Sequence, residues 1–262
     1  MTGQFDLSAT ARVPFARLVA VELRKARDTR AGFWLLAGTG VIVVVVLGIA
    51  TVITLVRSDP ISFGEFITIA AYMTSFLLPI LAIMLVTSEW SQRTALVTFT
   101  LEPRRSRVVL AKLVVAQLLT VLTLVVAFVV GVVCTAICEL VQPDLTSWAI
   151  GLGDLAGWLV TQTLTMLGGF ALATLLLNTP ASIVVFVVYR YVLPGIFVAA
   201  MALGGTLEQV AQWVDFQGAQ DGIYEWHLSG AEAWAHLVVS GLLWLGVPLV
   251  LGWRRILRAE VK

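Results

Sequence analysis

The segment 88-SEWSQRTALVTFTLEPRRSRVVLAK-112 interrupts an otherwise apolar part of the chain. It carries five cationic residues, and its carboxylates, Glu89 and Glu102, are the only acidic side chains between Glu65 and Glu139. Long uncharged apolar runs lie on both sides of it. The segment therefore separates two apolar units and places their adjoining ends in a polar environment.

The composition of the whole chain gives the protein class. Apolar residues make up 59% of the 262 residues, charged residues make up 13%, and the mean hydropathy is +0.95. Soluble domains are nearer a quarter charged, and a chain this apolar would expose large hydrophobic patches in water. We therefore predict an all-α integral membrane protein whose residues 1–262 form a single transmembrane domain.

Six stretches are long and apolar enough to cross a bilayer, which takes about 20 residues of helix. The fourth and fifth meet at Asn178, Thr179 and Pro180, where Thr179 is expected to cap a helix whose first turn holds the proline. The predicted spans are residues 31–56, 66–88, 112–138, 156–177, 181–203 and 234–253.

Lysine and arginine concentrate on one side of these spans. The segments before span one, between spans two and three, and after span six hold 15 of the 17 cations. An even number of spans puts all three segments on the same side, and the positive-inside rule makes that side the cytoplasm. We therefore expect both termini in the cytoplasm.

Two further segments have a helical pattern without the length of a span. Residues 14–30 read as a basic amphipathic helix in the cytoplasmic interface. Glu22 falls on its apolar face, which predicts a partner for that carboxylate. Residues 204–233 form an acidic external segment with helical spacing in "LEQVAQWV", which we expect to lie on or dip into the outer leaflet.

The interrupting segment is itself predicted to contain a helix, over residues 89–101. Trp90, Val97 and Leu101 have the spacing of one helical face, and Pro103 ends the helix. An ordinary cytoplasmic loop is the simpler interpretation, because arginines that set the topology and an interfacial tryptophan need no other role. A loop with a helix of its own favours a docking role instead.

The arrangement resembles the bacterial membrane subunits of ABC transporters of the type 2 (ABC-2) exporter permease family. The second cytoplasmic segment of that family looks like "E-aromatic-x-x-G-T … P-x-x-R … K". This sequence has Arg93 where the glycine often stands. The matching residues here are Glu89, Trp90, Thr94, Pro103, Arg107 and Lys112.

The resemblance implies a role for each segment. Residues 14–30, with Glu22, would be the family's elbow helix, and residues 89–101 would be a coupling helix that docks on a separate cytoplasmic ATPase. The residues implied in that coupling are Glu89, Trp90, Ser91, Gln92, Arg93, Thr94 and Val97.

The resemblance also implies an assembly in the bacterial cytoplasmic membrane. Six helices are half of such an exporter, so a second permease, as homo- or heterodimer, and two ABC ATPase subunits are the expected partners, together with membrane lipid and no nucleic acid. The chain has no G-x-x-x-x-G-K-[ST] sequence, so no catalytic residues are predicted in it. ATP and Mg²⁺ are expected in the ATPase partner, and no cofactor in this chain.

Arg190 is the one charge inside a predicted span, roughly 13 Å from its inner end at ~1.5 Å per residue. Pro194 follows four residues later, so an irregular backbone is expected there. Two interpretations stay open. Arg190 either bonds freed carbonyls or reaches toward the interface, or it lines the translocation pathway and meets an anionic group.

Other classes of membrane protein fit the sequence less well. A serine protease needs a Ser/His pair inside the membrane, whereas His227 and His236 lie at or beyond the outer ends of spans. A metalloprotease needs H-E-x-x-H, which is absent, and the two histidines lack the compact spacing of a metal site. No Asp or Glu lies in mid-span to couple ions. A non-transporting membrane anchor or sensor subunit remains the alternative.

Overall fold

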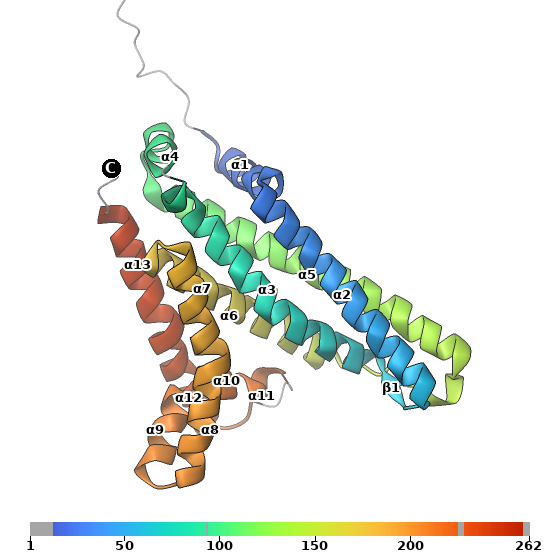
Figure 1. The fold of residues 1–262 in the computed structure, drawn as a ribbon. Helices are drawn as coiled ribbons and strands as arrows, with labels where there is room; N and C mark the ends of the chain where they lie inside the picture. Colours follow the sequence, from blue (N-terminus) through green and yellow to red (C-terminus); the bar gives the residue numbers. More distant parts are fainter. Residues whose placement is uncertain (1–12, 93, 225–227, 259–262) are drawn as a thin grey trace, which may run out of the picture.

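The structure is a computed structural model that describes residues 13–92, 94–224 and 228–258. Six helices in this part of the chain are long and apolar enough to cross a membrane, as the sequence predicts. Four are uninterrupted and two contain a short π-helical turn. They are α2 (Arg30–Arg57), α3 (Phe63–Ser91), α5 (Arg105–Val141), α6 (Leu152–Leu176), α7–η3–α8 (Thr179–Leu203) and α12–η4–α13 (Ala231–Arg258) (Figure 1).

The two interrupted spans divide at their π turns. The fifth span consists of α7 (Thr179–Val187), η3 (Val188–Val192) and α8 (Leu193–Leu203). The sixth consists of α12 (Ala231–Gly241), η4 (Leu242–Gly246) and α13 (Val247–Arg258).

Short elements connect the spans. The helices are α1 (Phe15–Asp28), α4 (Ala95–Leu101), η2 (Pro143–Leu145), α9 (Thr206–Val214), α10 (Phe216–Ala219) and α11 (Asp221–Tyr224). Strands β1 (Ile61–Ser62) and β2 (Thr146–Ser147) form a parallel pair, with Ile61 opposite Thr146, and join the ends of the α2–α3 and α5–α6 connections.

Helix α3 runs through the middle of the molecule and packs on α2, α5 and α6 (Figure 1). Its first half shares one apolar core with α2 and α5, and its second half shares another with α5, α6 and α13. Gly169 of α6 allows α3 and α6 to cross closely, because a Cβ at that position would lie 2.7 Å from the Cβ of Pro79 of α3. The bundle is thus organised around one central span.

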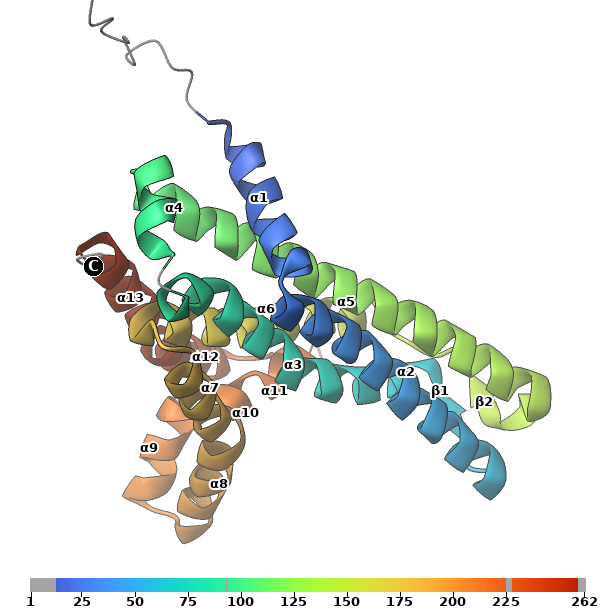
Figure 2. The same ribbon diagram turned by 45° about the horizontal axis from the view of Figure 1, so that its top comes forward.

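Helices α1 and α4 lie at the same end of the molecule as the C-terminal part of α13 (Figures 1 and 2). Helix α1 packs against α5 and α2, with Glu22 and Ala26 buried on its inner face. This end therefore gathers the three segments in which the sequence concentrates its cations.

The helix predicted over residues 89–101 begins later than expected. Residues 89–91 continue α3, and α4 starts only at Ala95. The backbone N–H of Thr94 closes the end of α3 by donating to the carbonyl of Glu89 at 2.9 Å. Because the Glu89 side chain is held inside the bundle, residues 89–91 continue helix α3. The helix ends after them.

The predicted cap at Thr179 is also wrong by one residue. The side-chain oxygen of Asn178 accepts the N–H of Ala181 at 2.9 Å and caps α7 instead. The Thr179 hydroxyl lies 2.6 Å from that of Thr87 on α3. Because the Thr179 hydroxyl bonds to Thr87, it does not cap α7.

The segment predicted to be external, residues 204–233, folds back onto the bundle. Phe216 and Ile223 are buried in the same apolar core as Leu237, and α11 packs against α6. The segment therefore contributes side chains to the interior of the helical bundle.

Candidate functional site

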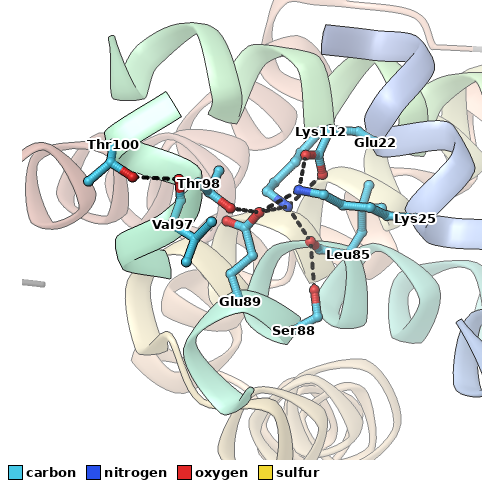
Figure 3. Close-up of polar contacts among 9 residues, drawn as sticks. All are labelled: Glu22, Lys25, Leu85, Ser88, Glu89, Val97, Thr98, Thr100 and Lys112. Atoms are coloured by element: carbon cyan, nitrogen blue, oxygen red, sulfur yellow. Dashed lines mark hydrogen bonds and ion pairs between the residues drawn. The ribbon is translucent and has the colours of Figure 1, made fainter. Parts of the chain in front are cut away.

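Four charged side chains from three helices meet beneath α4 (Figure 3). The Lys112 ammonium of α5 donates to Glu22 Oε2 of α1 at 2.7 Å and to the Leu85 carbonyl of α3 at 2.9 Å. It also lies 3.4 Å from Glu89 Oε1 of α3. We call Glu22, Lys25, Glu89 and Lys112 the charged cluster.

Three members of the charged cluster are buried, and its charges balance. Lys112 and Glu89 are each 3% exposed, and Glu22 is 4% exposed. Charges removed from water in this way are tolerated only when they are paired and hydrogen-bonded. Two carboxylates face two ammonium groups here, so the cluster carries no net charge, and the partner predicted for Glu22 is present.

Lys25 closes the cluster on its outer side. Its ammonium lies 2.7 Å from Glu22 Oε1 and 3.0 Å from Glu89 Oε1. Burial alone would lower the pKa of Lys25, but its hydrogen bond to Glu22 and the charge of Glu89 outweigh burial and raise the pKa above its ordinary value. Lys25 therefore stays protonated at neutral pH and joins both carboxylates.

Helix α4 is attached to the charged cluster by one hydrogen bond and to the end of α3 by one aromatic contact. The Thr98 hydroxyl donates to Glu89 Oε1 at 3.0 Å (Figure 3). The rings of Trp90 and Phe99 pack edge to face with centroids 5.9 Å apart. Glu89 thus contacts α1, α5 and α4 at once.

Arginines of the α4–α5 connection hold this end together. Arg107 pairs with Glu102 at 2.8 Å and donates to the Val13 carbonyl at 2.7 Å. Arg105 donates to the Ile256 carbonyl of α13 at 2.8 Å. These arginines satisfy backbone carbonyls and a carboxylate, which a purely topogenic loop would not require.

One face of α4 remains uncovered. Ala95 and Phe99 face the bundle, whereas Leu96, Val97 and Leu101 point outward, with Leu101 76% exposed. The predicted common face of Trp90, Val97 and Leu101 is therefore wrong, because Trp90 belongs to α3 and packs inward on Phe99. The exposed apolar set is Leu96, Val97 and Leu101.

The other predicted coupling residues are spread around the break between α3 and α4. Ser91 ends α3, Gln92 caps it, and Thr94 precedes α4. Arg93 lies outside the described residues. Sequence reasoning missed Lys25 and Thr98, although the spacing of three residues between Glu22 and Lys25 was a visible signal.

Arg190 and the histidines lie apart from this site. Arg190 belongs to η3, in the middle of the fifth span. The ring of His236 packs edge to face on Trp213, 4.5 Å between centroids, and His227 lies outside the described residues. Within the described part of the chain, no group of three or more His, Cys, Asp or Glu side chains is arranged to hold a metal ion.

Comparison with known proteins gives one family. Residues 18–203 match the family model described as ABC-2 family transporter protein. The match includes the whole charged cluster, α4 and Arg190, and it ends before residues 204–233. No curated protein matches the chain.

The charged cluster predicts a large effect of removing one charge. Lys112→Met leaves two buried carboxylates with one ammonium, so we expect a loss of about 3–5 kcal/mol in stability. The measurement is thermal unfolding of the purified chain in detergent. Lys112→Met with Glu89→Gln restores neutrality and should recover part of that loss.

The matched control is Arg27→Met, which breaks the exposed pair with Asp28. That variant should change stability by about 0–1 kcal/mol. Equal effects of Lys112→Met and Arg27→Met, or no recovery in the double variant, would contradict the description of the cluster as a buried, charge-balanced unit.

Proposed function

The chain belongs to the ABC-2 family of transporter membrane proteins, and on that premise we propose that it forms the translocation pathway of an ATP-driven exporter. Membrane permeases of this family lack an ATPase domain, so ATP hydrolysis belongs to partner subunits. ATP and Mg²⁺ are then bound by those partners.

We propose that α4 is the coupling helix that docks on the ATPase. The observation that carries this proposal is the combination of an exposed apolar face with a charged cluster behind it. Leu96, Val97 and Leu101 offer a surface of the kind that partners cover. Through Thr98 and Glu89, a displacement of α4 acts directly on α1, α3 and α5.

In this proposal α1 is the elbow helix. It lies beside the starts of α2 and α5, and Glu22 and Lys25 join it to the charged cluster. The basic residues Arg17, Arg24 and Arg27 are exposed and suit anionic lipid head groups at the cytoplasmic surface.

A second permease completes the transporter in this account. The fifth span, Thr179–Leu203, is mostly exposed, whereas α3 is largely buried. An apolar helix with so little cover suits contact with lipid or with another permease. Whether that permease is identical or a paralogue, two ATPase subunits would bind at the two α4 helices.

We propose that the end carrying α1, α4 and the C-terminal part of α13 faces the cytoplasm of a bacterial cell. Most of the chain's cations lie there, in agreement with the positive-inside rule. A non-transporting anchor or sensor subunit would have the same topology. Transport that depends on ATP hydrolysis separates the two functions.

The docking role predicts that polar substitutions on α4 weaken the complex. Val97→Ser with Leu101→Ser should lower the amount of P-loop ATPase recovered with the tagged permease by about tenfold, because it removes two exposed apolar side chains whose burial would stabilise the interface. The measurement is quantitative co-purification from the native host. Val141→Ser, at the exposed far end of α5, is the control. Unchanged recovery with the α4 variant would leave the segment as a plain loop.

The orientation predicts which residues an impermeant thiol reagent reaches. We place single cysteines at the exposed positions Arg104 and Gln209 in a chain with Cys134→Ala and Cys138→Ala. In intact cells the reagent should label Gln209→Cys and spare Arg104→Cys, and after permeabilisation it should label both. The reverse pattern in intact cells would overturn the orientation.

A further inference from the structure

A half-open cavity of about 320 Å³ lies between spans α3, α6 and α7–η3–α8 and the folded-back external segment. Its polar lining includes Ser75, Gln162, Thr165, Arg190 and Asp215. Gln162 and Arg190 belong to the middle of their spans, so the cavity lies at bilayer depth. Cavities of roughly this size hold small ligands.

The backbone is adapted around Arg190. Pro194 has no N–H for the carbonyl of Arg190, and the helix widens into the π turn Val188–Val192 just before it. Such turns occur frequently at functional sites. The irregular backbone that the sequence predicts is therefore present, and it coincides with the charged side chain that lines the cavity.

Arg190 brings a positive charge to a cavity that the carboxylates of Asp215 and Asp221 also line. Its Nε atom is buried and has no hydrogen-bond partner, and its guanidinium lies 5.6 Å from the centre of the Tyr191 ring. Among the described residues, no carboxylate forms an ion pair with it. An arginine at this depth that lacks a direct ion pair is unfavourable, and an anionic ligand group would stabilise it.

Gln162 presents an unused acceptor to the same cavity. It is 3% exposed, and its amide donates to the Ala71 carbonyl at 2.8 Å and to the Thr74 hydroxyl at 2.7 Å. These bonds fix the orientation of the amide and leave Oε1 buried without a partner. A ligand group that donates hydrogen bonds would satisfy it.

Further acceptors line the wall. The hydroxyl of Thr165 donates to a carbonyl of its own helix at 2.8 Å, so its oxygen remains free to accept. The hydroxyl of Ser75 donates to the Tyr72 carbonyl at 2.8 Å and is also hydrogen-bonded to Tyr191. Buried Asp215 uses Oδ1 to accept the N–H groups of Gln217 and Gly218, both at 3.1 Å. The wall therefore offers one cationic group and several acceptors, among them the two carboxylates of Asp215 and Asp221.

We propose that this cavity binds a small zwitterionic group, with its anionic oxygens at Arg190 and its ammonium facing Gln162 Oε1 and Asp215. An anion alone would leave the acceptors unsatisfied, and a cation alone would face Arg190. A group with both charges satisfies the guanidinium, the amide oxygen and the carboxylate together.

Two sources share this chemistry: the head group of phosphatidylethanolamine and a free zwitterion such as phosphoethanolamine. Tyr72 and Val198 also line the cavity and are exposed, so it opens between α3 and α8 onto the apolar outside of the chain. As a site for cargo or lipid, the cavity rests on the proposed transport function, but binding itself needs neither the ATPase nor nucleotide.

The test is calorimetric titration of the purified full chain in detergent, without ATPase or nucleotide. The probes are phosphoethanolamine, dihexanoyl phosphatidylethanolamine and dihexanoyl phosphatidylcholine. We expect at least one ethanolamine probe to bind. The choline lipid should bind about tenfold more weakly than its ethanolamine counterpart, because a trimethylammonium group donates no hydrogen bond to Gln162 Oε1.

Variants assign the binding to the cavity. Arg190→Gln should weaken binding by about tenfold or more, Arg190→Lys should weaken it less, and Arg57→Gln, at an exposed arginine outside the cavity, should not change it. If Arg190→Gln does not accumulate, Asp215→Asn carries the test with the same expected loss.

Binding of phosphoethanolamine alone supports a water-soluble zwitterion, and binding of the lipid alone supports a head group. The proposal is overturned if neither ethanolamine probe binds, if the choline lipid binds equally well, or if the cavity variants bind like the unmodified chain. If the permease binds a probe but does not transport, the binding site is supported and the proposed export function is contradicted.

Discussion

The ammonium group of Lys112 holds together the end of the molecule on which the proposed function depends. It contacts carboxylates from α1 and α3 and a carbonyl of α3, in a place almost closed to water. If any one of these helices withdrew, it would leave a buried charge without its partner, which costs several kcal/mol. The first helix, the end of the central span and the start of α5 are therefore constrained to keep their relative positions.

This constraint explains why the apolar chain is interrupted by a charged segment. Glu89 and Lys112 lie near the two ends of that segment and meet in the charged cluster, so the loop between them is anchored at both ends. The arginines between them bond to α13, to Glu102 and to the stretch before α1. The segment thus presents α4 on a rigid base, as a docking helix requires.

The middle of the bundle is built differently. The fifth and sixth spans each widen into a π turn, and the two turns meet where Tyr189 packs on Trp244, 4.8 Å between ring centroids. The cavity with Arg190 lies beside this contact. Ion pairs thus hold the end that carries α1 and α4, and irregular helices and unsatisfied polar groups occur in the middle of the spans.

Much of this architecture follows from the sequence, because hydropathy and charge act over short distances. The six apolar helices and the need of Glu22 for a partner could be predicted in that way. That the partner is Lys112 could not, since 90 residues separate the two. Residues 89–91 remain in α3 because of the tertiary partners of Glu89. Asp215 reaches the cavity only because residues 204–233 fold back onto the bundle. Neither feature can be predicted from local periodicity.

The most direct test of the central claim is a distance measurement between α1 and α4 during the transport cycle. Spin labels at the exposed positions Arg24 and Thr100 would be followed by double electron–electron resonance in the reconstituted complex, with and without ATP. The account predicts one distance distribution that nucleotide does not shift, because the charged cluster makes the two helices move together. A distribution that shifts or splits with ATP would contradict it.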